Sequence, residues 1–126
     1  MKSLVWMNGS LQPSEEMRIS PFDHGFTVGN GVFETMISYE EAPFAFTRHY
    51  ERLERSAAVM GLSLRPRSEL LEASLQVLDV NDLTGSRARL RITVTGGPAP
   101  LGSERGNSGE TTLVAASPTL EWSDME

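Results

Sequence analysis

The chain contains no cysteine and only two histidines, and its acidic residues outnumber its basic ones. Without cysteine, disulfides, thiolate metal sites and cysteine nucleophiles are all excluded, and such a composition fits a cytoplasmic protein. His24 and His49 are too few to favour a metal centre, so we expect no bound metal and a role for His24 in tying down a turn. The formal net charge of −6 argues against nucleic acid or an anionic membrane as a partner, because both repel an acidic chain.

Long apolar segments are also missing. No uninterrupted apolar run is long enough to span a bilayer, and the apolar core of the first ten residues is too short for a secretory signal. We therefore expect a soluble, cytoplasmic protein. A chain of 126 residues is long enough to form one domain with a hydrophobic core.

Short segments of alternating polarity predict a sheet. The clearest alternation runs from Ser86 to Thr95, and another follows a glycine-rich turn and ends at Tyr39. An Asn8–Gly9 turn predicts a hairpin near the start of the chain. Residues 96–109 are rich in glycine and proline and predict a long loop. We expect strands at residues 4–7, 10–12, 32–39, 44–46, 86–95 and 111–116.

Two helices are expected between the strands. The first is predicted to run from a cap at Thr47 to Met60 and to stop at Gly61. The second is predicted to follow Pro66, with Ser68 as its cap. These elements predict an α+β domain, in which two consecutive helices pack on one face of a mainly antiparallel sheet. The expected buried residues are Tyr50, Leu53, Ala57 and Met60 in the first helix, and Leu71, Leu75 and Leu78 in the second.

One arginine on the first helix is a candidate phosphate ligand. A guanidinium has fixed, permanently charged donors that match phosphate oxygens. From the helix alone, however, Arg52 is most simply an exposed residue in weak surface ion pairs with nearby glutamates.

Longer motifs point beyond that simple interpretation. They are DHGFTVGNGVFET at 23–35 and RHYERLERS at 48–56, with VWMNG at 5–9. Together they resemble the N-terminal domain of the class IV aminotransferases, the fold-type IV pyridoxal-phosphate enzymes. That family includes branched-chain aminotransferases, D-amino-acid aminotransferases and 4-amino-4-deoxychorismate lyases. The resemblance covers nearly the whole chain.

The resemblance implies a cofactor site and a substrate site. Arg52 matches the arginine of the family's HxxRL motif, so it is expected to bind the phosphate of pyridoxal phosphate, with His49 one turn earlier on the same side. Phe33, Glu34 and Thr35 are expected to border the substrate. Phe33 occupies a position that is often tyrosine in relatives, and it lacks the hydroxyl that can bond a carboxylate. It can equally be a core residue, and Glu34 and Thr35 can be an ordinary solvated pair.

The loop at 96–109 is a further candidate for substrate binding. In D-amino-acid aminotransferases the matching loop supplies charged side chains to the neighbouring subunit's site, but Gly96 stands here where those enzymes have an arginine. Arg105 can take over that role by closing over an anion, or it can be an exposed loop residue. Relatives dimerise through this domain, which implies a homodimer.

The chain has one lysine, Lys2, which lies outside every family motif. Pyridoxal-phosphate chemistry needs a Schiff-base lysine, and in the family that lysine belongs to a second domain. We therefore expect residues 1–118 to form the N-terminal α+β domain and residues 119–126 to begin a linker, with the catalytic-lysine domain absent and no catalytic residue here. The expected function is that of an N-terminal half, inactive alone, of an aminotransferase or lyase acting on an amino acid or an aminodeoxychorismate-type substrate. The alternative is a non-catalytic binding or assembly module with the same fold.

Overall fold

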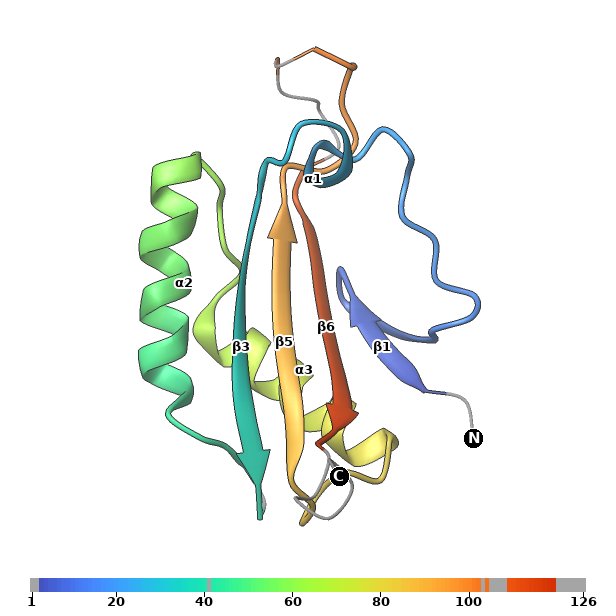
Figure 1. Cartoon of the computed structure of the whole chain (residues 1–126), viewed down its shortest axis with the longest axis vertical. Coiled ribbons are helices and arrows are strands. Elements are labelled where there is room, and N and C mark those ends of the chain that lie inside the picture. Colours follow the sequence, from blue (N-terminus) through green and yellow to red (C-terminus); the bar gives the residue numbers. More distant parts are fainter. Residues whose placement is uncertain (1–2, 41, 103, 105–108, 120–126) are drawn as a thin grey trace, which may run out of the picture.

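The computed structural model describes residues 3–40, 42–102, 104 and 109–119. Within these residues the chain forms one six-stranded antiparallel sheet with the strand order β2-β1-β6-β5-β3-β4 (Figure 1). The predicted α+β class is thereby confirmed. The strands are β1 (Leu4–Met7), β2 (Ser10–Pro13), β3 (Gly31–Tyr39), β4 (Ala42–Pro43), β5 (Ala88–Thr95) and β6 (Thr111–Pro118), and the helices are α1 (His24–Thr27), α2 (Phe46–Met60) and α3 (Arg67–Val80).

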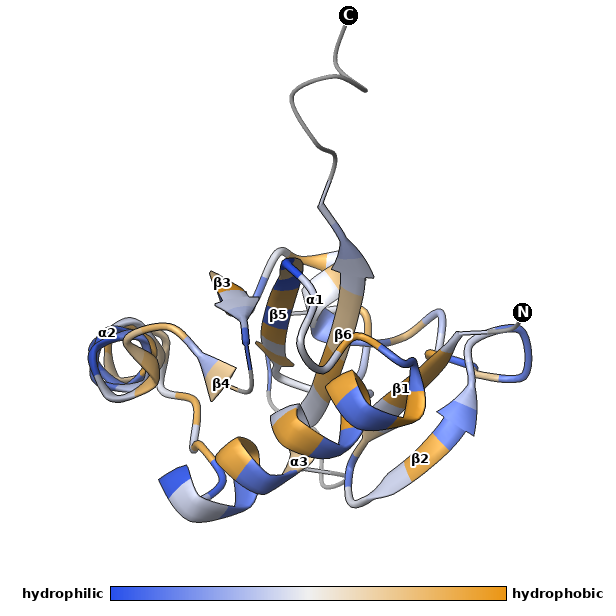
Figure 2. Cartoon of the chain, turned by 90° about the horizontal axis from the view of Figure 1, so that it is seen from below, coloured by the Kyte–Doolittle hydropathy of each residue, from blue (hydrophilic) through white to orange (hydrophobic). Residues whose placement is uncertain are grey.

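The hydrophobic core lies between one face of the sheet and the two long helices. The predicted alternation in β5 holds, because alternate residues from Ala88 to Val94 are buried while Arg89 and Arg91 are exposed. The helix α3 crosses behind the sheet and α2 runs beside β3 (Figures 1 and 2). Side chains on the other face are half-buried or exposed, so the described residues leave that face uncovered. No helix among them is both long and apolar enough to cross a membrane.

The strand order brings early and late parts of the chain together. Strand β1 lies between β2 and β6, and the Asn8 N–H donates to the carbonyl of Thr112 while the Thr112 N–H donates to Asn8 Oδ1. At the other end of β1, the Asn81 side chain accepts from the Leu4 N–H at 2.7 Å and donates to the Leu4 carbonyl at 2.8 Å. These bonds attach the end of α3 to the start of β1.

The start of α2 differs from the prediction. Thr47 is not the cap: the helix begins at Phe46, and the N-cap is Ala45, which has a left-handed backbone (φ 55°) and forms no capping bond. The short strand is Ala42–Pro43 rather than 44–46, because the chain leaves the sheet at Phe44 to make this turn. The end of α2 at Gly61 is as expected, since Gly61 adopts the left-handed conformation that terminates helices.

The buried side of α3 also differs. Pro66, not Ser68, is the N-cap residue. Leu78 is buried as predicted, but Leu75 is exposed and Leu71 only half-buried. The helix carries two apolar rows, and the one that faces the sheet includes Ser74, whose hydroxyl donates to the Leu70 carbonyl and so needs no other partner. The buried row is Leu70, Ala73, Ser74, Val77 and Leu78.

Helix α1 was not predicted, because a four-residue helix leaves no periodic pattern. Its N-cap is Asp23, whose carboxylate accepts from the Gly25 N–H and from the Thr111 hydroxyl, both at 2.8 Å. The buried His24 ring lies 2.7 Å from the Pro100 carbonyl, consistent with the expectation that His24 ties down this turn. These contacts join α1 to both ends of the loop between β5 and β6.

Candidate functional site

A charged cluster lies between β3 and α2. Glu34 points to the helix side of β3 and is 7% exposed. The Nδ1 atom of His49 lies 2.7 Å from Glu34 Oε1, and Arg52 donates from Nε to Oε2 at 3.3 Å, with Nη2 3.2 Å from Oε1. His49 and Arg52 are three residues apart on α2, so both reach the same carboxylate. Glu34 thereby fixes the orientation of the two side chains that were predicted to bind the cofactor.

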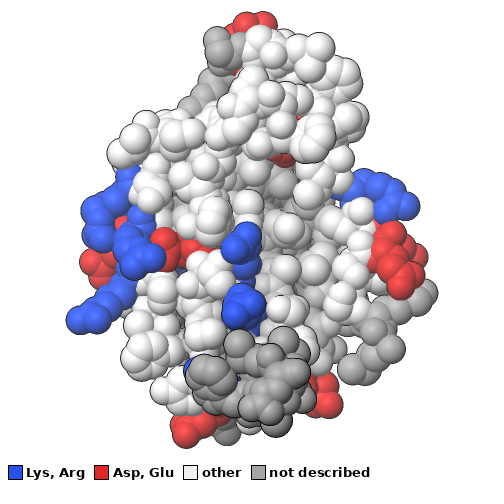
Figure 3. Space-filling view, in the orientation of Figure 1, with Lys and Arg blue, Asp and Glu red and all other residues white. Residues whose placement is uncertain are grey.

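The arginine in this cluster remains accessible. The Arg52 side chain is 64% exposed although Glu34 holds it from the inner side. It contributes to a surface pocket with two more arginines, and Figure 3 shows basic side chains gathered over α2. A guanidinium that is oriented yet open, beside further positive charges, suits an anion such as phosphate. The pocket is lined by Phe44, Ala45, Arg48, His49, Glu51, Arg52 and Arg55.

A second cluster lies on the open face of the same strand. Phe33 is 56% exposed, and the guanidinium of Arg91 lies over its ring, 4.2 Å from the centroid. Arg91 also donates from Nε to the Thr35 hydroxyl at 2.9 Å. Thr35 and Arg91 are direct cross-strand partners, so the register of β3 and β5 creates this contact. Arg91 Nε is occupied, and no described residue bonds the two terminal nitrogens, which can therefore bind a ligand.

The structure thus divides the predicted residues into two groups. Arg52 and His49 both contact Glu34 on the helix side of β3, while Phe33 and Thr35 lie on its open face. Glu34 is therefore placed apart from the other two predicted substrate residues, and its direct role toward substrate stays a prediction. Arg105 lies outside the described residues.

Arg91 was not among the predicted site residues. Alternation along β5 placed it on the polar side of the strand, but Phe33 and Thr35 are more than fifty residues away in sequence. Only the pairing of β3 with β5 brings them together. Among the described residues, no group of three or more His, Asp or Glu side chains could hold a metal ion.

Comparisons with known proteins agree with the motifs. The model of the family described as amino-transferase class IV matches residues 31–124. An aminodeoxychorismate lyase of Bacillus subtilis is 37% identical over 95 residues, which cover 75% of this chain and 32% of that protein. A D-alanine aminotransferase of Staphylococcus aureus is 35% identical over 90 residues, covering 71% of this chain and 32% of that protein. The chain thus spans about a third of the length of these curated relatives.

Solved structures show the same fold. A branched-chain amino acid aminotransferase from Escherichia coli superposes with a TM-score of 0.85 at 25% identity, over 94% of this chain and 42% of that one. A T.th. branched-chain amino acid aminotransferase complexed with N-(5'-phosphopyridoxyl)-L-glutamate has a TM-score of 0.84 at 30% identity, over 94% of this chain and 40% of that one. Because the family model matches well over half of the residues, the chain belongs to the class IV aminotransferase family.

Proposed function

We propose that this chain is part of a pyridoxal-phosphate-dependent aminotransferase or aminodeoxychorismate lyase, and that it supplies the residues that bind the cofactor phosphate and one wall of the substrate site. The family supports pyridoxal phosphate as the cofactor. The observation that carries the proposal is the state of Arg52, which a buried carboxylate holds in place while most of its side chain stays exposed.

The residues present fit the cofactor's phosphate. Glu34 balances one positive charge of the pocket, and the guanidiniums of Arg48 and Arg55 line the same pocket as Arg52. Because Glu51 also lines the pocket, its three arginines exceed the two carboxylates, Glu34 and Glu51, by one positive charge, which favours a bound anion. The Nδ1 atom of His49 faces Glu34, and no described residue bonds its other ring nitrogen, which can therefore contact the bound group.

When bound, pyridoxal phosphate supplies an electron sink for chemistry at the substrate's α-carbon. The residues of this chain then have binding and orienting roles. Arg52 and His49 hold one end of the cofactor, and Phe33 forms an apolar wall that excludes water. Arg91, positioned by the Thr35 hydroxyl and the Phe33 ring, binds a carboxylate of the substrate. Glu34 acts through Arg52 and His49 as a positioning residue.

The test uses the protein expressed from its complete reading frame, incubated with pyridoxal phosphate and reduced with borohydride. We expect one covalently labelled lysine, located by peptide mapping. If no lysine is labelled, the enzyme proposal is refuted and a non-catalytic module is the better explanation.

The phosphate assignment has its own test. We expect Arg52→Gln to weaken pyridoxal phosphate binding by about 10-fold or more, because a hydrogen bond to a charged group contributes about 1.5–3 kcal/mol. Binding of pyridoxal, which lacks the phosphate, should change little. Arg67→Gln, an exposed arginine on α3, is the matched control. Equal loss of both ligands in Arg52→Gln would contradict the assignment.

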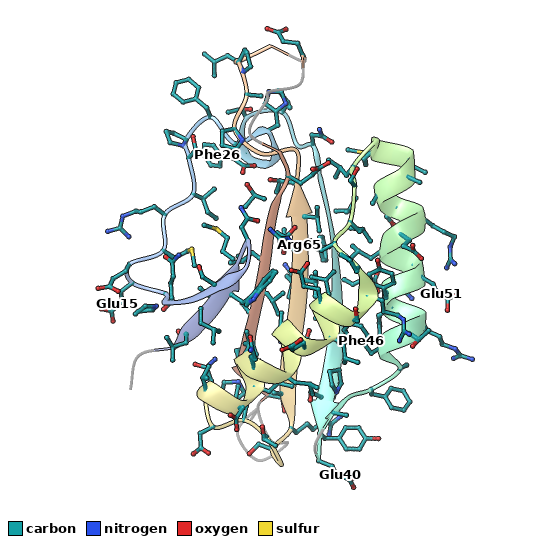
Figure 4. All side chains as sticks on the ribbon, turned by 180° about the vertical axis from the view of Figure 1, so that it is seen from behind. Glu15, Phe26, Glu40, Phe46, Glu51 and Arg65 are labelled. Atoms are coloured by element: carbon teal, nitrogen blue, oxygen red, sulfur yellow. The ribbon has the colours of Figure 1, made fainter. Side chains whose placement is uncertain are left out.

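The same proposal includes a homodimer in the cytoplasm. Apolar side chains are exposed around α1, where Phe26 is 82% and Phe22 50% exposed, and Leu101 in the adjoining loop is 68% exposed (Figure 4 labels Phe26). Such a surface is suited to burial against a second copy. Light scattering of the purified protein tests the dimer, and Phe26→Ser should shift it toward monomer. Cell fractionation tests the location.

A further inference from the structure

Three arginines form one stripe along α2. Arg48, Arg52 and Arg55 are spaced four and three residues apart, so they project from the same side of the helix. All three line the surface pocket that contains His49, and Figure 3 shows basic side chains gathered over α2. Seven residues of helix span about 10 Å, which is longer than one phosphate group. The pocket therefore holds more arginine than one bound phosphate requires.

The three arginines are held differently. Arg52, in the middle of the stripe, is fixed to the carboxylate of Glu34. Arg48 and Arg55 are exposed, and neither forms a hydrogen bond or an ion pair with a described residue. Holding such a long, free side chain against a ligand costs conformational entropy, whereas Arg52 is already oriented. The middle arginine is thus suited to direct contact, and the outer two are suited to act through their charge at a distance.

The charge of the whole molecule makes the outer pair important. A net charge of −6 repels an anion, and a phosphate ester carries a charge of about −1.5 to −2 at pH 7. Around the pocket, three arginines against Glu34 and Glu51 leave an excess of one positive charge. Without Arg48 and Arg55 the same region would have an excess of one negative charge. The outer pair therefore decides the sign of the local field that an approaching phosphate meets.

We infer that Arg48 and Arg55 are steering residues: they attract the cofactor's phosphate toward Arg52 during the encounter and contribute little to holding it afterwards. This inference rests on the proposed function, because it takes pyridoxal phosphate as the ligand of the pocket. Long-range attraction raises the association rate and weakens as salt is added, whereas direct bonds set the dissociation rate. Binding kinetics therefore separate the two roles.

The experiment measures binding to the full-length protein after its cofactor has been removed. The probe is pyridoxine 5'-phosphate, which has the phosphate but no aldehyde and so binds reversibly. Temperature-jump relaxation, followed by the fluorescence of the probe at several concentrations, gives the association and dissociation rates. At low salt we expect Arg48→Gln/Arg55→Gln to slow association about 10-fold and each single change to slow it about 3-fold. At 1 M salt, where the Debye length is about 3 Å, the difference should nearly vanish.

The dissociation rate distinguishes steering from direct contact. We expect the double glutamine variant to leave it within about 2-fold of the unchanged protein, and Arg52→Gln to raise it by more. Arg48→Lys/Arg55→Lys keeps both charges and should keep the association rate, because steering depends on charge and not on guanidinium geometry. Pyridoxine, which lacks the phosphate, should associate with all of these proteins at the same rate.

Arg18→Gln is the matched control for each single change, since it removes one positive charge from an exposed arginine. Arg18 belongs to the segment between β2 and α1, which lies at the opposite edge of the sheet from α2 (Figure 1). We expect Arg18→Gln to leave the association rate unchanged. An equal loss in Arg18→Gln would show an effect of net charge alone and overturn the inference.

The remaining outcomes separate this inference from the proposed function. If borohydride labels a lysine but the double glutamine variant associates as fast as the unchanged protein, only the steering role fails. A loss that persists at 1 M salt, or that lies in the dissociation rate, would make Arg48 and Arg55 direct ligands and overturn steering as well. If no lysine is labelled, the proposed function fails, whereas salt-dependent capture of the probe through Arg48 and Arg55 would preserve the steering role.

Discussion

The most informative single change is Glu34→Gln, which keeps the shape of the side chain and removes its charge. Glu34 is 7% exposed and joins His49 and Arg52. A hydrogen bond to a charged group contributes about 1.5–3 kcal/mol when it is protected from solvent. The pair with Arg52 contributes less, at most about 1 kcal/mol, because that side chain is 64% exposed and screened by water. Glutamine keeps one acceptor, so we expect the free energy of unfolding to fall by about 1–2 kcal/mol.

The assay is urea unfolding followed by circular dichroism, with melting temperature as a second measure. A loss of 1–2 kcal/mol corresponds to about 3–8 °C for a domain of this size. A double-mutant cycle with His49→Gln should give a larger coupling energy than one with Arg52→Gln, because His49 is 20% exposed and Arg52 64%. Glu72→Gln, on the exposed side of α3, is the control and should change stability by less than about 0.5 kcal/mol. Zero coupling between Glu34 and His49 would refute the view that this carboxylate orients the site.

Three further changes probe the fold. Leu53→Ala should cost about 2–5 kcal/mol in chemical denaturation, because Leu53 is fully buried, whereas Val59→Ala, at 86% exposure, should be close to neutral. Gly97→Ala should lower the melting temperature, because Gly97 has a φ of +77° and a methyl group there would collide with the Gly109 carbonyl; a melting curve like that of the unchanged protein would contradict this packing. Burial raises the pKa of Tyr50 above its ordinary value of 10.0, with Glu54 raising it further and Arg67 opposing. As the pH rises, the unfolded chain therefore loses the Tyr50 hydroxyl proton before the folded chain does. The free energy of unfolding is unaffected below about pH 10 and falls above it. Tyr50→Phe should reduce this alkaline loss in unfolding curves measured over a series of pH values.

Much of the architecture could be predicted from local patterns. The alternation from Ala88 to Val94 correctly predicted one strand and its buried side, and Gly61 correctly predicted the end of α2. Features that depend on tertiary contacts could not be predicted. Which of the two apolar rows on α3 is buried depends on the sheet beneath the helix. The start of α2 depends on a left-handed backbone at Ala45, which no residue type in the sequence predicts.

In the candidate site, too, local patterns predicted some features, while those that depend on tertiary contacts could not be predicted. The spacing of His49 and Arg52 on one helix predicted that they lie together, and the structure adds that both meet Glu34. Neighbouring residues such as Glu34 and Thr35 lie on opposite sides of a strand, but alternation could not show that α2 covers one side. Arg91 could not be paired with Thr35 before the register was known. Substrate roles for Phe33, Glu34, Thr35 and Arg105 remain predictions.

The position of β1 has a consequence for how the protein is made. The hydrogen bond between Asn8 and Thr112 joins residues 104 apart in sequence. The N-terminal hairpin must therefore leave the ribosome and wait until β6 has been synthesised before it can enter the sheet, and contacts of such long range slow folding. During that interval Trp6, which the finished sheet buries, lacks its cross-strand neighbour Val114, so nascent chains that stall before Thr111 should be the forms most prone to aggregate or to recruit chaperones.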